Sequence, residues 1–259
     1  MRHTLLVLVL AAVALAALLA WWTLSRPGGP SDTAIAEHDV APFRNIEING
    51  AAEVTLRQGS AERVSILAPT RGLRVSAEVQ DGTLVINARD TRRWWHNLFG
   101  GARSSRSAKL TVTFRNLESV ALAGAVKLTA TSLVTPSLRL EAAGGSTLRI
   151  EGLRTDSLHV EADGALKAHL AGTATEQHVS IAGASEYNAG DLASQTASVD
   201  VSGVGHVVLR VAKTLDASIS GAGSVEYYGN PQVNKSVSGV GKVRQRDADA
   251  PRVPHLHVA

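Results

Sequence analysis

The sequence predicts an all-β fold, a parallel β-solenoid whose coils are 18–20 residues long. A glycine recurs at intervals of 20, 20, 19, 20, 18 and 18 residues, which indicates one structural unit repeated along an axis. Apolar and polar residues alternate on both sides of this glycine, as in strands with one buried face. The repeat is too short for a strand–helix–strand unit, which needs about 30 residues. The recurring glycines are Gly124, Gly144, Gly164, Gly183, Gly203, Gly221 and Gly239.

Each repeat is predicted to be two short strands joined by a corner at the glycine, which supplies a positive φ or a close backbone approach. One repeat cannot bury its own apolar face, but copies stacked about 4.8 Å apart can. The apolar positions two before and four after the glycine include Leu122, Ala142, Ala162, Ile181 and Val201, then Leu128, Leu148, Ala168, Tyr187 and Val207. An antiparallel meander is the alternative, although its hairpins would show two-residue turn signals.

The first segment predicts a membrane connection. Residues 5–24 are apolar but for one threonine, and a helix of this length spans about 30 Å of hydrocarbon. Trp21 and Trp22 lie near its far end, as interfacial aromatics do, and Arg2 favours a cytoplasmic N-terminus. We expect residues 1–24 to form one transmembrane helix, a signal anchor in the inner membrane, with the solenoid in the periplasm. A cleaved signal peptide, leaving a periplasmic or secreted protein, is the alternative.

The rest of the chain is predicted to have three parts. Residues 25–42 are rich in proline and glycine and indicate a flexible linker. Residues 43–245 form the solenoid domain, whose N-terminal part is partly antiparallel because Asp81-Gly82 between two alternating runs is a hairpin signal. Residues 246–259 are predicted to be a disordered tail.

An insertion at residues 89–107 interrupts the strand pattern with arginines, tryptophans and a phenylalanine. One hypothesis is a loop that folds back onto the solenoid or covers its end. Another is a contact surface for anionic lipid head groups or an acidic polymer, because cations around exposed tryptophan suit an interface. A third is disorder. The candidate contact residues are Arg92, Arg93, Trp94, Trp95 and Phe99.

Three features together resemble one family. They are the segment Phe43-x-x-Ile46-x-Ile48-x-Gly50, the repeated Ser-Gly-x-Gly coils, and the ending from Ile219 to Pro231. The chain resembles the head GIN domain family, named for auto-transporter adhesins. The resemblance implies a bacterial envelope protein with a right-handed β-helical head and no established activity. The long insertion and the N-terminal anchor depart from the family pattern.

Two outward-facing rows contain side chains that can bind metal ions or transfer protons. A row three positions before the glycine contains Glu141, Glu161, Ser180 and Asp200, and could bind calcium or a cationic partner. Five positions before it, His159 and His178 should lie about 5 Å apart in adjacent coils. No third metal ligand is evident, because His169 and His206 lie beyond the corner. We interpret both rows as solvated surface, and we expect no catalytic residues, no metal site and no cofactor.

Composition narrows the function further. There is no cysteine, which excludes disulfides, a thiol nucleophile and a cysteine metal cluster. The formal charge is only +3 and the basic excess is concentrated in the insertion, so nucleic acid is not an expected partner. The glycine phrases are not phosphate loops, since no helix follows them.

We therefore predict a non-enzymatic binding, adhesion or structural module of the cell envelope. Its expected partners are the membrane, through the N-terminal helix, and an envelope polymer, a lipid surface or another protein. One alternative is a carbohydrate-active lyase or hydrolase on a β-helix. Another is a scaffold that assembles end to end through its terminal coils.

Overall fold

The computed structural model describes residues 36–67, 73–90 and 107–246. These residues belong to one compact unit, Ile35–Ala259. The predicted anchor at residues 1–24, the linker up to residue 35 and the tail beyond residue 246 lie outside the described residues, as do positions 91–106 of the insertion. Within the described ranges, no helix is long and apolar enough to cross a membrane.

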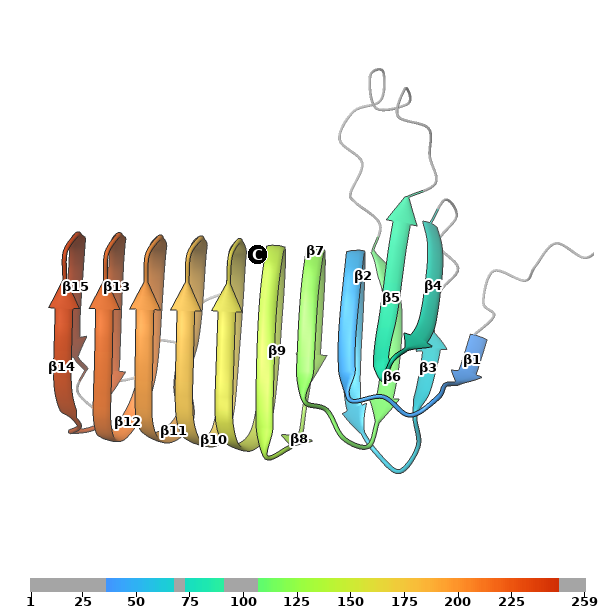
Figure 1. Cartoon of the computed structure of the whole chain (residues 1–259), viewed down its shortest axis with the longest axis horizontal. Coiled ribbons are helices and arrows are strands. Elements are labelled where there is room, and N and C mark those ends of the chain that lie inside the picture. Colours follow the sequence, from blue (N-terminus) through green and yellow to red (C-terminus); the bar gives the residue numbers. More distant parts are fainter. Residues whose placement is uncertain (1–35, 68–72, 91–106, 247–259) are drawn as a thin grey trace, which may run out of the picture. The chain divides into compact units, whose positions relative to one another are not determined.

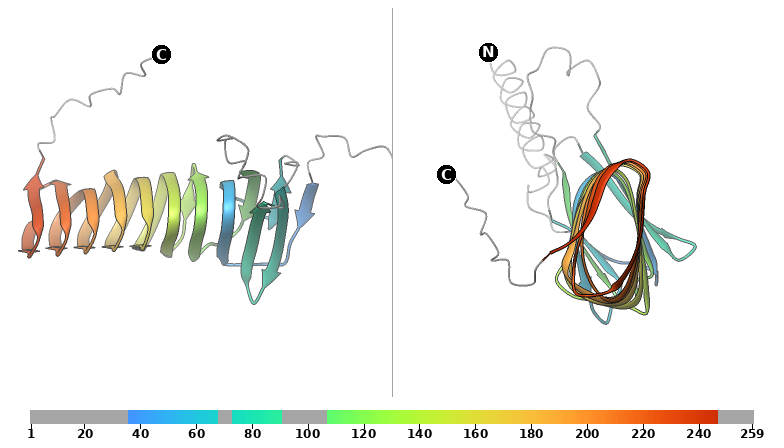
Figure 2. Two further views of the ribbon diagram at one scale, coloured as in Figure 1. Left: turned by 90° about the horizontal axis from the view of Figure 1, so that it is seen from above. Right: turned by 90° about the vertical axis from the view of Figure 1, so that its left-hand side faces the viewer.

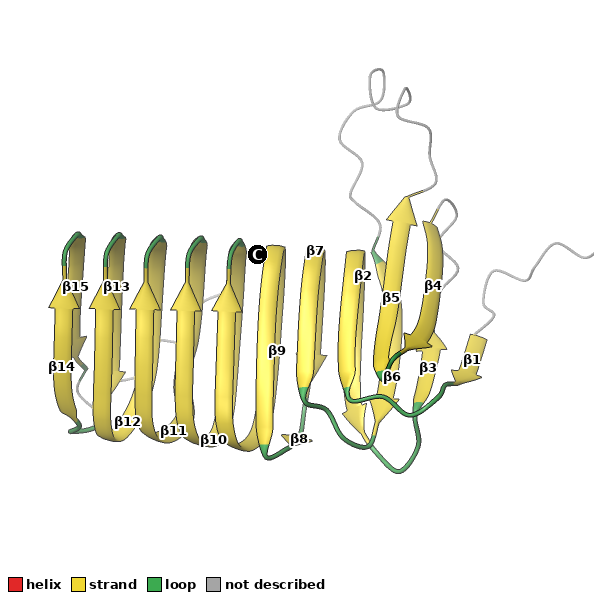
Figure 3. Ribbon diagram, in the orientation of Figure 1, coloured by secondary structure: helices red, strands yellow, loops and turns green. Residues whose placement is uncertain are grey.

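All described strands belong to one sheet (Figures 1 and 3). Residues 36–39, which belong to the predicted linker, form the first strand of this sheet. The strands are β1 (Ala36–Asp39), β2 (Asn45–Gln58), β3 (Arg63–Ile66), β4 (Leu73–Gln80), β5 (Thr83–Asp90), β6 (Ala108–Phe114), β7 (Ser119–Ala130), β8 (Leu133–Val134), β9 (Ser137–Ala162), β10 (Ala165–Ile181), β11 (Ala184–Val201), β12 (Val204–Ile219), β13 (Ala222–Tyr228), β14 (Gln232–Val237) and β15 (Val240–Gln245).

The predicted parallel solenoid is confirmed. β7, β9, β10, β11 and β12 pair in parallel in chain order, each in register with the coil before it. Seen along the stacking direction, these coils superimpose around a common interior, the lumen (Figure 2). The parallel pairing excludes the antiparallel meander for this part of the chain.

The corner glycines are required because successive backbones meet there. Gly50, Gly124 and Gly144 are register partners. A Cβ on Gly124 would lie 2.5 Å from the Gly50 carbonyl oxygen, and a Cβ on Gly144 would lie 2.7 Å from that of Gly124. The same overlap, closer still, recurs at Gly164, Gly183, Gly203, Gly221 and Gly239. The sequence predicts either a positive φ or a close backbone approach at the glycine. Gly124 and Gly144 have both, since their φ angles are +120° and +118°.

The lumen is packed with aliphatic side chains from the predicted inward rows. Both rows are buried from the first parallel coil to the last but one, as the alternation required. Small residues suit these thin coils, because each pair of flanks leaves little room between them. The buried members are Leu122, Ala142, Ala162, Ile181, Val201 and Ile219 before the corner, and Leu128, Leu148, Ala168, Tyr187, Val207 and Val225 after it.

A buried tyrosine–glutamine pair lies within this aliphatic interior. Gln177 is completely buried, and its register partners in the neighbouring coils are Leu158 and Ala197. The Tyr187 hydroxyl donates a hydrogen bond of 3.1 Å to Gln177 Oε1. The small side chain of Ala168, directly beside Tyr187 in the ladder, leaves space for the ring. Burial raises the pKa of Tyr187 far above its ordinary value of 10.0.

The N-terminal part is partly antiparallel, as predicted. β4 and β5 form a hairpin whose turn residues, Asp81 and Gly82, have φ angles of 49° and 75°. Positive φ at both positions is typical of the two-residue turns that join twisted antiparallel strands. β3 also pairs antiparallel with β1 and β6.

The insertion leaves the solenoid at a corner. β2 pairs with β5 through residues 45–50 and with β6 through residues 52–58, so β5 and β6 are the two flanks of one coil. The break between them falls beside Gly50, whose register partner in β5 is Ala88. The insertion therefore replaces the tight corner that every later coil makes with glycine.

We expect Gly144→Ala to lower the free energy of unfolding by roughly 2–4 kcal/mol, because the new Cβ overlaps the Gly124 carbonyl and the backbone has a positive φ. Urea denaturation followed by circular dichroism measures the loss. The matched control is Gly145→Ala, whose Cβ would have no heavy atom within 4 Å. Its effect should stay within about 0.5 kcal/mol. Equal losses in the two variants would contradict the role of the corner.

Stability should fall at high pH because of Tyr187. The unfolded chain releases this phenolic proton near pH 10, while the folded chain retains it, so folding is opposed as the pH rises above that value. The loss approaches about 1.4 kcal/mol per pH unit, and this group contributes no pH dependence below pH ~9. Denaturation of wild type and Tyr187→Phe between pH 8 and pH ~11 tests this. Parallel stability curves for the two proteins would show that the phenol is not held neutral.

Candidate functional site

The outward side chains form two surfaces of the solenoid. We call the outward-facing residues of the strands that lead into the corner glycines the leading flank. The outward-facing residues of the strands that follow the glycines are the trailing flank. Because the coils stack in register, residues at equivalent positions form straight rows along each flank.

The leading flank carries an acidic hollow of about 240 Å³. Its acidic members are Glu47, Glu141, Glu161 and Asp163, and its floor includes Ala121, Ala123 and Ala143. The predicted row is present, since Ser180 is the register partner of both Glu161 and Asp200. Arg139 lies 3.2 Å from Glu141 and 3.7 Å from Glu161. These carboxylates are about half exposed, so they are solvated surface groups that share one arginine.

The predicted proximity of His159 and His178 is confirmed. His159 and His178 are register partners, and their stacked ring centroids are 6.3 Å apart. Their ring nitrogens lie 3.9 Å from Glu161 and 3.7 Å from Glu176, respectively. Among the described residues, no three or more His, Cys, Asp or Glu side chains are grouped to hold a metal ion. His206 lies on the trailing flank, where its Nδ1 is 2.7 Å from Ser224 Oγ.

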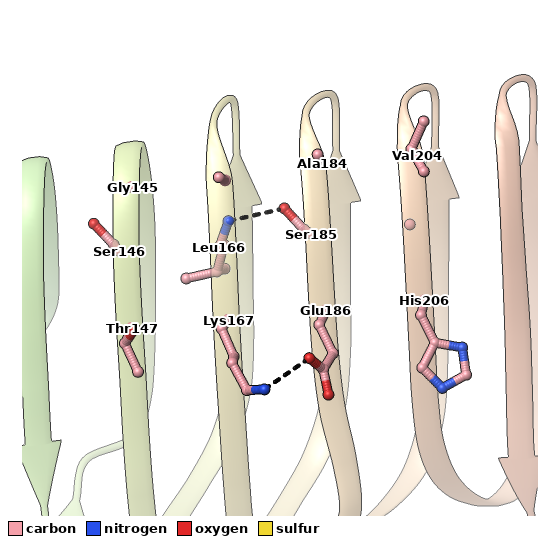
Figure 4. Close-up of a pocket in the computed structure, with 12 residues that line it drawn as sticks. Gly145, Ser146, Thr147, Leu166, Lys167, Ala184, Ser185, Glu186, Val204 and His206 are labelled. Atoms are coloured by element: carbon pink, nitrogen blue, oxygen red, sulfur yellow. Dashed lines mark hydrogen bonds and ion pairs between the residues drawn. The ribbon is translucent and has the colours of Figure 1, made fainter.

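The trailing flank carries a shallow groove of about 570 Å³ across four coils (Figure 4). Small residues line one side of it: Gly145, Ala165 and Ala184, followed by Val204, which is 63% exposed. Thr147, Lys167, Glu186 and His206 line the other side. Lys167 Nζ lies 3.0 Å from Glu186 Oε2, and this ion pair joins adjacent coils. The groove therefore offers a smooth strip beside a polar row of mixed charge.

A second charged ladder joins the first coils of the trailing flank. Glu53 in β2 lies between Lys127 in β7, at 3.2 Å, and Lys109 in β6, at 3.6 Å. The hydrogen bond from Lys127, supported by the charge of Lys109, lowers the pKa of Glu53 below its usual value. The pairs are partly exposed, so they tie neighbouring strands together with only a small contribution to stability.

One cluster on the trailing flank was missed by sequence reasoning. Alternation places Glu226 on the outward face, yet it is 3% exposed. Arg244 and Arg246 cover it: each guanidinium places Nε 2.9 Å from one of the two carboxylate oxygens. Arg246 and Arg210 also stack over the Tyr228 ring, 5.7 Å and 4.9 Å from its centroid. Aligning the repeats would have found the cluster, because Glu226 and Arg244 occupy equivalent positions.

The predicted contact residues of the insertion, Arg92, Arg93, Trp94, Trp95 and Phe99, lie outside the described residues. Their role stays a prediction. The structure brings together the predicted acidic row and the histidine pair, and it adds the groove of the trailing flank and the Glu226 cluster. None of these surfaces holds a deep cavity with convergent polar groups of the kind that small-molecule sites use.

Comparison with known proteins agrees with this architecture. Residues 42–231 match the family model described as "Putative auto-transporter adhesin, head GIN domain". The chain belongs to the head GIN domain family. No curated protein matches the chain.

Solved structures share the fold of this head GIN domain. A putative adhesin from Bacteroides fragilis is 22% identical, with a TM-score of 0.71 over 84% of this chain and 99% of that one. A putative adhesin from Parabacteroides distasonis is 19% identical, with a TM-score of 0.59 over 84% and 98%. A protein described as a putative lipid binding protein, also from Parabacteroides distasonis, is 17% identical, with a TM-score of 0.54 over 85% and 98%. At these identities the likeness establishes the fold alone.

Proposed function

We propose that this head GIN domain is a non-enzymatic binding or adhesion module of the bacterial cell envelope. The observation that carries the proposal is the geometry of the trailing flank. It presents an open groove with one smooth side, crossed by successive coils at a regular spacing of about 4.8 Å. A surface of this kind suits an extended or repetitive partner that makes many small contacts. The family description and the names of the similar structures, adhesins and a lipid-binding protein, agree with such a role.

The acidic hollow supports binding better than hydrolysis. A glycosidase needs two carboxylates with different roles, one of them kept protonated by its surroundings. Glu141 and Glu161 are both half exposed and share Arg139, so their surroundings are alike. The described phenylalanines and tyrosines, which could stack on a sugar, are not on this flank. Phe43, Phe114 and Tyr187 are buried, Tyr227 packs against the core, and Tyr228 lies under Arg210 and Arg246 on the trailing flank.

The proposed location is outside the cytoplasm, as the auto-transporter description of the family suggests. Residues 1–24 would hold the domain in the inner membrane, with the solenoid facing the periplasm. The insertion leaves the first coils at a corner. Its arginines and tryptophans would bind a partner with an anionic surface. An envelope polymer carrying carboxylate or phosphate groups fits these features best.

A binding experiment tests this proposal. The full chain, held in neutral lipid nanodiscs, is titrated with alginate, polyglutamate and phosphatidylglycerol vesicles. Combined alanine substitution of Arg92, Arg93, Trp94, Trp95 and Phe99 should weaken binding by about 10-fold or more, since each arginine near an anionic surface contributes about 1 kcal/mol.

The matched control removes two exposed arginines outside both the insertion and the groove of the trailing flank, Arg44→Ala with Arg63→Ala, and so changes the net charge by the same amount as the insertion arginines. It should bind nearly as well as wild type. An equal loss of affinity in the control would show that the insertion is not the contact surface. If wild type binds none of the three probes, the proposed binding function is overturned.

A further inference from the structure

Among the described residues, the last coil of the solenoid has no strand paired beyond it. β14 pairs with β12 and β15 with β13, and no other strand in the described ranges pairs with either, so each has one unpaired edge there (Figure 1). This coil, residues 232–245, lies beyond residues 42–231 that the family model matches. Free edges above an apolar interior are a template for pairing with another chain.

At one inward position, this coil carries a different kind of residue from the equivalent position of the earlier parallel coils. The row four residues before the corner glycine is apolar and buried along the parallel coils: Val120, Leu140, Val160, Val179, Val199 and Ala217. In the last coil the register partner of Ala217 is Lys235, and Lys235 is exposed. A charged side chain therefore occupies the place where the pattern requires valine or alanine.

The remaining inward positions of this coil divide into covering and polar residues. Val233 and Val243 are half-buried and continue the rows of Leu215 and Val225. Gln245 continues the row of Tyr227 and donates a hydrogen bond of 2.6 Å from Nε2 to the Gly229 carbonyl. Val237 continues the row of Ile219 and is 42% exposed. The coil thus covers the aliphatic lumen beneath it with valines, and it presents polar groups at Lys235 and Gln245.

The physical consequence concerns a second copy of this chain. Two such ends meeting about a two-fold axis would pair their free edges and cover each other's lumen. The same contact would bury both Lys235 ammonium groups in an aliphatic interior, facing like charge. Burial of an unpaired ammonium costs more than the apolar contacts around it return. Terminal coils of repeat proteins need a polar outer face for the same reason.

We propose that the last coil is a cap and that Lys235 is the residue that keeps this end from pairing with a second copy. This end of the solenoid is a latent dimer interface, and the charge of Lys235 prevents it from pairing. The inference is independent of the proposed binding function, because it concerns the end of the solenoid and not its flanks.

The decisive variant is Lys235→Val, which restores the residue found at the equivalent positions Val179 and Val199. The full chain is purified in detergent, and its protein mass is measured by light scattering over a range of concentrations. Wild type should remain at the monomer mass of 27.1 kDa. The variant should move toward twice that mass as concentration rises, with the β-sheet circular dichroism signal retained.

Two controls separate position from composition. Lys242→Val makes the same change at an outward position of β15 and should stay monomeric. Lys235→Glu keeps a charge in the row and should also stay monomeric. If Lys235→Val does not fold, Lys235→Ala, which repeats the residue of the coil below, takes its place. Folded Lys235→Val or Lys235→Ala protein that remains monomeric overturns the proposal, as does dimerisation of wild type or of either control.

Discussion

The close approach of successive backbones at the glycine corner is the constraint on which the rest of this structure depends. At each corner from Gly124 to Gly239 a Cβ would overlap the carbonyl of the preceding corner. Each coil can therefore rest on the last only when glycines coincide, and this coincidence sets the register of both flanks. Once the register is set, every side chain position becomes a row that runs along the solenoid.

The rows explain both the interior and the surface. Inward rows share a thin lumen, so they are filled mainly by aliphatic residues, and the fully buried Tyr187 lies beside the small Ala168. Outward rows place like positions of adjacent strands together, so charges on neighbouring coils meet and form ladders such as Lys109–Glu53–Lys127. The surface that results has long shallow grooves and few enclosed spaces, which favours contact with extended partners.

Much of this could be predicted because the repeat carries its own alignment. The spacing of glycines and the alternation beside them were sufficient for the coil length, the parallel pairing and the inward rows, and the Asp81-Gly82 turn was sufficient for the hairpin. The acidic row and the His159–His178 pair followed from the same alignment. Exceptions to the alternation were harder to predict. Gln177 is buried in an inward row that otherwise holds aliphatic residues. Glu226 is buried although the alternation predicts that it faces solvent.

The sequence by itself determined the architecture, because a local periodic pattern with an obligatory small corner residue has few ways to bury its apolar face. Only the tertiary structure decided which of the outward and inward positions depart from the pattern. Glu226 is covered because Arg244 and Arg246, from the last coil and its end, lie over it, and Lys235 is exposed because no described strand pairs with the far edge of β14. Such differences depend on what lies above and below a residue, which its own segment of sequence does not contain.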